Sequence, residues 1–196
     1  MNEIINGDCL EEMKKMDDKS IDLTITSPPY DNLRDYHGYT FDFEGIAREL
    51  YRITKDGGVV VWVVGDATIN GSETGTSFKQ ALYFKEIGFN LHDTMIWEKT
   101  GIPFPSEVRY NQSFEYMFVF SKAKPKTINL IADKKNIMAG SERKNVSYRT
   151  KDGFTKSSGW KIKDFGIRNN IWKYQTGSNK SSKDKIAYQH PAIFHE

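Results

Sequence analysis

Apolar and polar positions in the first 120 residues follow the periods of strands and helices in turn. Residues 21–26 alternate between apolar and polar side chains, which predicts a half-buried strand ending before Pro28-Pro29. Residues 43–51 place apolar side chains at the spacing of an amphipathic helix, and Gly57-Gly58 separates this helix from the next segment. Residues 59–64 are apolar throughout, which is typical of a strand in the middle of a parallel sheet.

The remaining pattern completes an alternation of strands and helices. In chain order, we expect a short extended stretch at 3–6, a helix burying Leu10 and Met13, a helix at 77–87 capped by Gly88, and strands at 91–97 and 114–120. A loop with Pro103 and Pro105 joins the last two strands. This order predicts an α/β fold with a doubly wound, Rossmann-like sheet. From Lys122 to Asn170 the pattern supports no assignment.

Composition narrows the class of protein. The chain has 196 residues, enough for one packed domain, and its 12 Phe, 10 Tyr and 4 Trp exclude wholesale disorder. The longest apolar run, residues 59–64, is too short to cross a membrane, and the amino terminus lacks the pattern of a secretory signal. The single Cys9 can form neither an internal disulfide nor a cysteine-based zinc site, and the histidines show no metal-ligand spacing. We therefore expect a cytoplasmic globular protein without a metal.

Charge is distributed unevenly along the chain. Residues 1–120 hold 11 Lys and Arg against 20 Asp and Glu, whereas residues 121–185 hold 17 against 5. A basic segment on an acidic body indicates contact with a polyanion, and a solvated lysine-rich tail is the alternative. Aromatic residues interleave with the cations, which favours the first interpretation. They are Tyr148, Phe154, Trp160, Phe165, Trp172 and Tyr174.

The segment Thr26-Ser27-Pro28-Pro29-Tyr30 leaves the predicted strand at the end where α/β sheets bind ligands. Two prolines fix two φ angles and supply no N–H donor, so their carbonyls are held rigidly. The Ser27 hydroxyl and the Pro28 carbonyl can both accept hydrogen bonds from an amino group, while Tyr30 can stack on a flat ring. A plain Pro-Pro turn with a tyrosine lid explains the spacing equally well.

Family resemblance favours the first interpretation. Ser27-Pro28-Pro29-Tyr30 resembles the Asp/Asn/Ser-Pro-Pro-Tyr/Phe signature of amino-group DNA methyltransferases, which methylate N4 of cytosine or N6 of adenine. Segments around it resemble the same family in the same order. They are Ile5 to Glu11, Asp18 to Leu23, Gly57 to Asp66, Ile96 to Lys99 and Glu115 to Lys122, followed later by His190-Pro191-Ala192.

The resemblance implies particular roles for these residues. S-adenosylmethionine is the implied cofactor, held by Asp8, Cys9, Leu10 and Ser27, while Ser27, Pro28, Pro29 and Tyr30 form the catalytic loop. The order of motifs resembles the β arrangement, in which the basic region recognises double-stranded DNA. The expected phosphate contacts are Arg143, Lys144, Arg149, Lys151, Lys156, Lys161 and Lys163.

In the implied mechanism, a flipped base stacks on Tyr30 and its amine attacks the sulfonium methyl group. Serine at position 27 favours cytosine N4 over adenine N6, and RNA or a protein glutamine amide are further candidate substrates. Asp31, Tyr36 and Tyr39 are candidates to shape the base pocket. A covalent cytosine-C5 mechanism through Cys9 is rejected because no proline precedes it.

One part of the family pattern is missing. No strand ends in the glycine-rich turn that holds the methionine part of the cofactor, and Gly71 to Thr76 is better interpreted as a surface loop. We therefore expect a catalytic α/β portion at 1–121, a target-recognition segment at 122–185 and the start of the missing half at 186–196. The chain would need a second chain or a homo-oligomer to complete the cofactor pocket; a DNA-recognition module without catalysis is the alternative.

Overall fold

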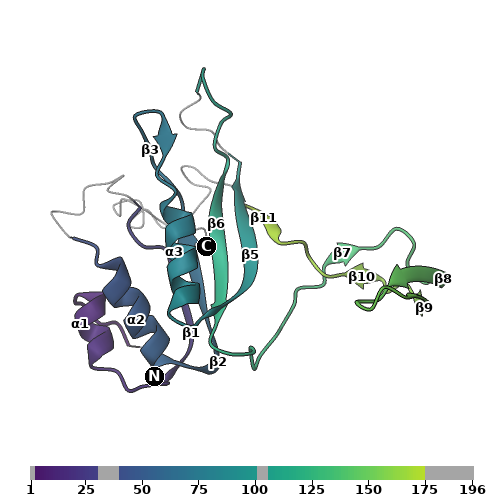
Figure 1. Ribbon diagram of the computed structural model, residues 1–196, viewed down its shortest axis with the longest axis horizontal. Coiled ribbons are helices and arrows are strands. Elements are labelled where there is room, and N and C mark those ends of the chain that lie inside the picture. The colour runs from purple at the N-terminus through teal and green to yellow at the C-terminus, as the bar shows by residue number, and fades with distance from the viewer. Residues whose placement is uncertain (1–2, 31–39, 101–105, 175–196) are drawn as a thin grey trace. The chain divides into compact units, whose positions relative to one another are not determined.

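The computed structural model describes residues 3–30, 40–100 and 106–174, which form two compact units (Figure 1). The first contains residues up to Thr127 and residues from Asn170 onward, and the second contains Ile128–Asn169. The expectations for Asp31, Tyr36, Tyr39, Pro103, Pro105 and residues 175–196 lie outside the described residues.

The first unit is built on a five-stranded sheet with the order β1-β2-β6-β5-β11. Its strands are β1 (Ile21–Thr26), β2 (Thr54–Val64), β6 (Phe114–Ser121), β5 (Asn90–Lys99) and β11 (Ile171–Tyr174). β1 runs parallel to β2, and β11 runs parallel to β5. β6 is antiparallel to both of its neighbours. The predicted α/β class is therefore confirmed, with a mixed sheet.

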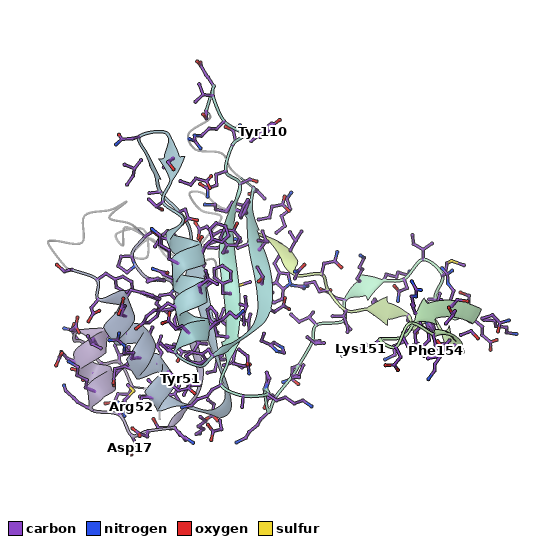
Figure 2. All side chains as sticks on the ribbon, in the orientation of Figure 1. Asp17, Tyr51, Arg52, Tyr110, Lys151 and Phe154 are labelled. Atoms are coloured by element: carbon purple, nitrogen blue, oxygen red, sulfur yellow. The ribbon has the colours of Figure 1, made fainter. Side chains whose placement is uncertain are left out.

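The helices of this unit are α1 (Cys9–Lys14), α2 (Phe43–Ile53) and α3 (Thr76–Glu86). All three were expected from the apolar spacing, and Gly88 takes a φ of +115° just beyond α3, as its predicted capping role requires. Arg52 of α2 ties α1 to α2, because its guanidinium donates to the carbonyl oxygens of Met13 and Met16 at 2.7 and 2.8 Å (Figure 2).

One core joins the three helices to the sheet. Trp62 of β2 is 1% exposed and meets Phe84 of α3 edge to face, with ring centroids 5.1 Å apart. The indole N–H donates to Gln80 at 2.8 Å, so its polar group is satisfied inside the core. Phe120 of β6 stacks on Phe84 at 4.5 Å, and Ile46 of α2 is 4% exposed. This aromatic core fixes the sheet on which the candidate site stands.

Two expectations for the first unit are wrong. Residues 3–6 pair with no strand within the described residues, and Ile4 is 98% exposed. β2 begins at Thr54, directly after α2, instead of beyond Gly57-Gly58. Gly57 stays inside the strand at a φ of +85°, with its N–H donating to the Lys122 carbonyl. A bulge at this left-handed position keeps the strand paired where the sequence suggested a break.

β1 and β11 are the two edge strands of the sheet within the described residues. The exposure of β1 and the presence of β11 were not expected from the periodicity of the sequence. Leu23 and Ile25 of β1 are 54% and 64% exposed, on the face they share with Val59 and Val61. β11 contains Trp172 and Tyr174, which the sequence analysis assigned to the basic segment. They pair with Trp97 and Lys99 of β5.

The second unit consists of β7 (Lys134–Lys135), β8 (Glu142–Arg149), β9 (Thr155–Lys161) and β10 (Phe165–Gly166). β8 and β9 form an antiparallel hairpin, and β7 pairs with β10. No residue from 128 to 169 is buried. The unit is therefore held mainly by backbone pairing and side-chain hydrogen bonds.

Within the described residues, no helix has the length and apolar character needed to span a membrane.

Candidate functional site

The segment Ser27-Pro28-Pro29-Tyr30 directly follows β1, at the carboxyl end of the strand. β1 fixes its start, because Thr26 is paired with Trp62 in the neighbouring parallel strand. Pro28 is buried, while Ser27, Pro29 and Tyr30 are partly buried. The pairing of Thr26 and the burial of Pro28 therefore fix the position of the loop at the edge of the sheet where the strand ends.

A cavity of about 480 Å³ opens beside this loop. It brings together the segments around Asp8 and Ser27, two separate motifs that were expected to form one site. The polar and loop residues that line it are Gly7, Asp8, Cys9, Thr24, Thr26, Ser27, Pro28 and Pro29. The apolar wall is formed by Met13, Phe41, Ile46, Leu50 and Trp62. A cavity of this size, mostly apolar with a few polar groups, is typical of small-molecule sites.

Of the four predicted cofactor residues, Asp8, Cys9 and Ser27 line the cavity and Leu10 packs against the core. Asp8 is the N-cap of α1, and its Oδ1 accepts from the N–H groups of Leu10 and Glu11 at 3.0 and 3.1 Å. Cys9, the single cysteine of the chain, is exposed. The two capping bonds orient the carboxylate of Asp8, which lines the cavity, and the cofactor contacts themselves stay a prediction.

The Tyr30 hydroxyl links the loop after β1 to β6 and, through Glu115, to β5. The Tyr30 hydroxyl lies 2.6 Å from Ser27 Oγ and donates to Glu115 Oε2 at 3.0 Å. The other oxygen of Glu115 accepts from Lys99 Nζ at 2.8 Å. The Glu115 and Lys99 side chains are 16% and 28% exposed, so this chain of contacts is largely screened from water.

A second acidic residue lies at the carboxyl end of β2. Asp66 is 9% exposed, and it accepts from the backbone N–H and the hydroxyl of Ser77 at 2.8 and 2.5 Å. Thr74 Oγ1 adds a longer contact of 3.4 Å. Asp66 therefore anchors the first turn of α3. The hydrogen bonds offset the free-energy cost of burying its carboxylate.

Sequence reasoning missed the roles of Glu115, Lys99 and Asp66. Glu115 carried a signal, because it is the one acidic side chain in the otherwise apolar and aromatic strand 114–120. Burial of a carboxylate requires a partner, so its position alone predicts a nearby cation or donor. That Lys99 and Tyr30 supply these partners could only be seen once β5, β6 and the loop after β1 were placed.

The seven predicted phosphate contacts all fall in the second unit, and all are exposed. Arg143, Lys144 and Arg149 lie on β8, and Lys156 and Lys161 lie on β9. Lys151 lies in the turn between these strands, near Phe154 (Figure 2), and Lys163 follows β9. The unit has 10 Lys and Arg against 4 Asp and Glu, which makes it strongly basic.

The pairing register divides the hairpin into two faces. Cross-strand partners share a face, and successive residues alternate between faces. Three pairs define what we call the aromatic face: Arg143 with Trp160, Val146 with Ser158, and Tyr148 with Lys156. The opposite face includes the pairs Arg149 with Thr155 and Ser147 with Ser157. Cations therefore occur on both faces, while the strand aromatics Tyr148 and Trp160 lie on one.

The aromatic face borders a groove of about 660 Å³ in the same unit. Arg143, Val146 and Trp160 line it from the hairpin, and Phe165 lines it from β10. Trp160 and Phe165 are 53% and 51% exposed. Lys161 and Lys163 add positive charge to the groove. Exposed ring surface beside cations is a combination that suits nucleic acid.

The sheet and the loop after β1 define an α/β fold that a solved DNA methyltransferase shares. The solved PvuII DNA methyltransferase, described as cytosine-N4-specific, superposes with a TM-score of 0.61 at 20% identity, covering 96% of this chain and 64% of that chain. The chain belongs to the DNA methylase family of N6 and N4 amino-methyltransferases, which it matches over residues 21–196.

Two relatives extend this result. The chain is 63% identical over 183 residues to the orphan methyltransferase M.BamHII of Bacillus amyloliquefaciens, covering 91% of this chain and 69% of that protein. It is 27% identical over 164 residues to the type II methyltransferase M.SmaI of Serratia marcescens, covering 62% and 56%. The resemblance drawn from the sequence is therefore confirmed, and S-adenosylmethionine is the cofactor of this family.

Proposed function

We propose that this chain carries the catalytic loop and the DNA-recognition unit of an S-adenosylmethionine-dependent enzyme that methylates an exocyclic amino group of a flipped base in double-stranded DNA. One observation carries the proposal: Ser27, Pro28 and Pro29 border the same cavity as Asp8 and Cys9. Family membership supplies the class of reaction, and this cavity supplies a place where the base and the cofactor can meet.

The cavity residues suit the adenosine part of the cofactor. The apolar wall, which includes Met13, Leu50 and Trp62, can cover a flat purine, and Asp8 at the rim can accept from ribose hydroxyls. When bound, the cofactor supplies an electrophilic methyl group on a sulfonium. The contribution of the chain itself is to hold the target amine in line, through hydrogen bonds to Ser27 Oγ and the Pro28 carbonyl.

Removing the Ser27 hydroxyl tests whether this residue accepts a hydrogen bond from the target amine. We expect Ser27→Ala to lower methyl transfer from labelled cofactor to duplex DNA by about 10²–10³-fold, because the amine loses a preorganised acceptor. Ser20→Ala is the matched control: Ser20 directly precedes β1, and its hydroxyl donates to the Asp17 carbonyl at 2.7 Å. Equal rates for wild type and Ser27→Ala would contradict the proposal.

Cytosine N4 is the proposed target atom, and adenine N6 is the alternative. The preference rests on serine at position 27, since adenine enzymes of the family more often have Asp or Asn there. Digestion of the methylated duplex to nucleosides, followed by mass spectrometry, distinguishes the two products directly. N6-methyladenine would overturn the cytosine assignment while leaving amino methylation intact.

DNA is the proposed partner of the second unit, whose seven predicted contact residues are all exposed. Counterion release makes phosphate contacts weaken steeply as salt rises. We therefore expect duplex affinity to fall on a log–log plot between low and moderate ionic strength. Affinity insensitive to salt would contradict this, and tighter binding to RNA would favour the alternative nucleic-acid substrate.

A further chain segment is the proposed neighbour of β1. Within the described residues β1 pairs only with β2, and it exposes Leu23 and Ile25. An unpaired strand edge is a template for another strand. We expect the chain to bind S-adenosylmethionine weakly by isothermal titration, and more tightly when the remaining part of M.BamHII or a second copy is supplied. Tight binding by a monomeric chain would contradict this.

A further inference from the structure

We infer that Glu115 is a positioning residue of the active site: it orients the hydroxyls of Tyr30 and Ser27 so that Ser27 accepts from the target amine, and it receives the proton that methylation releases. The inference rests on the proposed function. Its structural basis is the contact chain from Ser27 through Tyr30 to Glu115, with Lys99 bound to the far carboxylate oxygen.

The direction of the hydrogen bonds follows from counting protons. A tyrosine hydroxyl has one proton, and in this structure Tyr30 donates it to Glu115 Oε2 at 3.0 Å. The contact of 2.6 Å between Tyr30 and Ser27 must then run the other way, with Ser27 donating. The Ser27 proton therefore points toward Tyr30, which leaves the lone pairs of Ser27 Oγ to accept from a substrate amine.

Lys99 keeps this direction fixed. Its ammonium lies 2.8 Å from Glu115 Oε1, on the oxygen that Tyr30 does not use. In this ion pair the Glu115 carboxylate can only accept hydrogen bonds, so both Lys99 and Tyr30 are its donors. Gly65 directly follows β2 and lies beside this chain of contacts, since a Cβ added there would lie 3.6 Å from both Tyr30 and Glu115.

The same chain can move a proton. As the amine nitrogen forms its bond to the methyl carbon, the carbon–sulfur bond breaks and its electron pair stays on sulfur, so the nitrogen becomes positively charged. The nitrogen then gives one proton to Ser27 Oγ, Ser27 gives its own proton to Tyr30, and Tyr30 gives its proton to Glu115. The reaction ends with a neutral base and a protonated carboxyl, which returns the proton to water.

Glu115 could also have a purely structural role, as the partner of Lys99 in an ion pair that links β5 to β6. Kinetic measurements distinguish this structural role from the positioning role. We expect Glu115→Gln to lower the single-turnover rate by about tenfold to hundredfold while the KM for DNA is nearly unchanged. Glu115→Asp should recover part of the rate. Glu98→Gln is the control, since Glu98 lies next to Lys99 and pairs with Lys173 at 2.6 Å.

A double-variant cycle tests the path. If the effect passes through Tyr30, Glu115→Gln should cost nothing further in a Tyr30→Phe background. The same cycle in thermal unfolding should also be non-additive, and this readout does not depend on catalysis. Additive rates, or a normal single-turnover rate for Glu115→Gln, would overturn the inference and leave the proposed function standing. Absence of methyl transfer by the wild-type chain supplied with the remaining part of M.BamHII would instead overturn the proposed function. Additive unfolding would then show separately that the contact chain is not coupled.

Discussion

The two units of this chain bring functional side chains together by opposite means. In the first unit, Ser27 and Tyr30 follow a strand whose neighbour carries Trp62, which is 1% exposed in an aromatic core. In the second unit no residue from 128 to 169 is buried, and the candidate DNA contacts lie on a hairpin in solvent. A core fixes the side chains of a site in precise positions, whereas the exposed basic side chains of the second unit have no core to hold them.

The difference in burial gives the largest expected effect. Trp62→Ala should reduce the free energy of unfolding of the first unit by about 3–5 kcal/mol, because it removes a buried ring and leaves its cavity. Trp160→Ala is the matched substitution in the second unit, where the ring is 53% exposed. It should change stability by no more than about 0.5 kcal/mol. Urea unfolding followed by circular dichroism measures both.

Similar losses for the two tryptophans would break the comparison, since they would show that the second unit has a stabilising core of its own. Gln80→Ala refines the test of the first unit. It removes the acceptor of the Trp62 indole and should cost about 1–3 kcal/mol, because a buried donor is left without its partner.

The next largest effect concerns DNA affinity, which substitutions on the two faces of the hairpin should change in different ways. Trp160→Ala should weaken duplex affinity by about 1–3 kcal/mol with little change in its salt dependence, as expected of a stacking contact. Arg149→Ala, on the opposite face, should reduce the slope of log affinity against log salt by about 1, as expected of a phosphate contact. Fluorescence anisotropy at several salt concentrations measures both quantities. A reduced slope for Trp160→Ala and an unchanged slope for Arg149→Ala would reverse the assignment of the faces.

Acid should affect the second unit slightly through one surface ion pair. Arg168 donates to both oxygens of Asp133, and this contact lowers the pKa of the Asp133 carboxyl below its usual value. A lowered folded-state pKa means that the stabilisation is complete above the usual value of about 3.9 and is lost as pH falls below it. The protection of amides in residues 128–169 against exchange, relative to their intrinsic rates, should therefore fall below about pH 4. The dependence should be smaller in Arg168→Ala, and an identical dependence would show that Asp133 is not responsible.

Sequence patterns predicted those parts of the molecule that depend on local order. Residues 21–26 and 43–51 have the periods of a strand and a helix, and the structure has β1 and α2 there, because the apolar face of each element is set by neighbours two to four positions away. Ser27-Pro28-Pro29-Tyr30 was found from sequence for the same reason, since its chemistry comes from consecutive residues. The charge of the second unit needed only counting.

Failures occurred where pairing decides the structure. Gly57 looked like a break, but backbone bonds to Lys122 and Lys126 keep it in the sheet. The strands of the second unit could not be assigned, since a hairpin with two polar faces has no apolar alternation to show it.

The sequence by itself thus determined the fold class, the candidate catalytic loop and the charge of the basic segment, because each depends on residues that are neighbours along the chain. Only the tertiary structure decided that Tyr30 meets Glu115, which is 85 positions away, and that Glu115 meets Lys99. The reason is physical. β5, β6 and the loop after β1 meet through sheet pairing and core packing, and no local pattern records which distant side chains that packing brings within hydrogen-bonding distance.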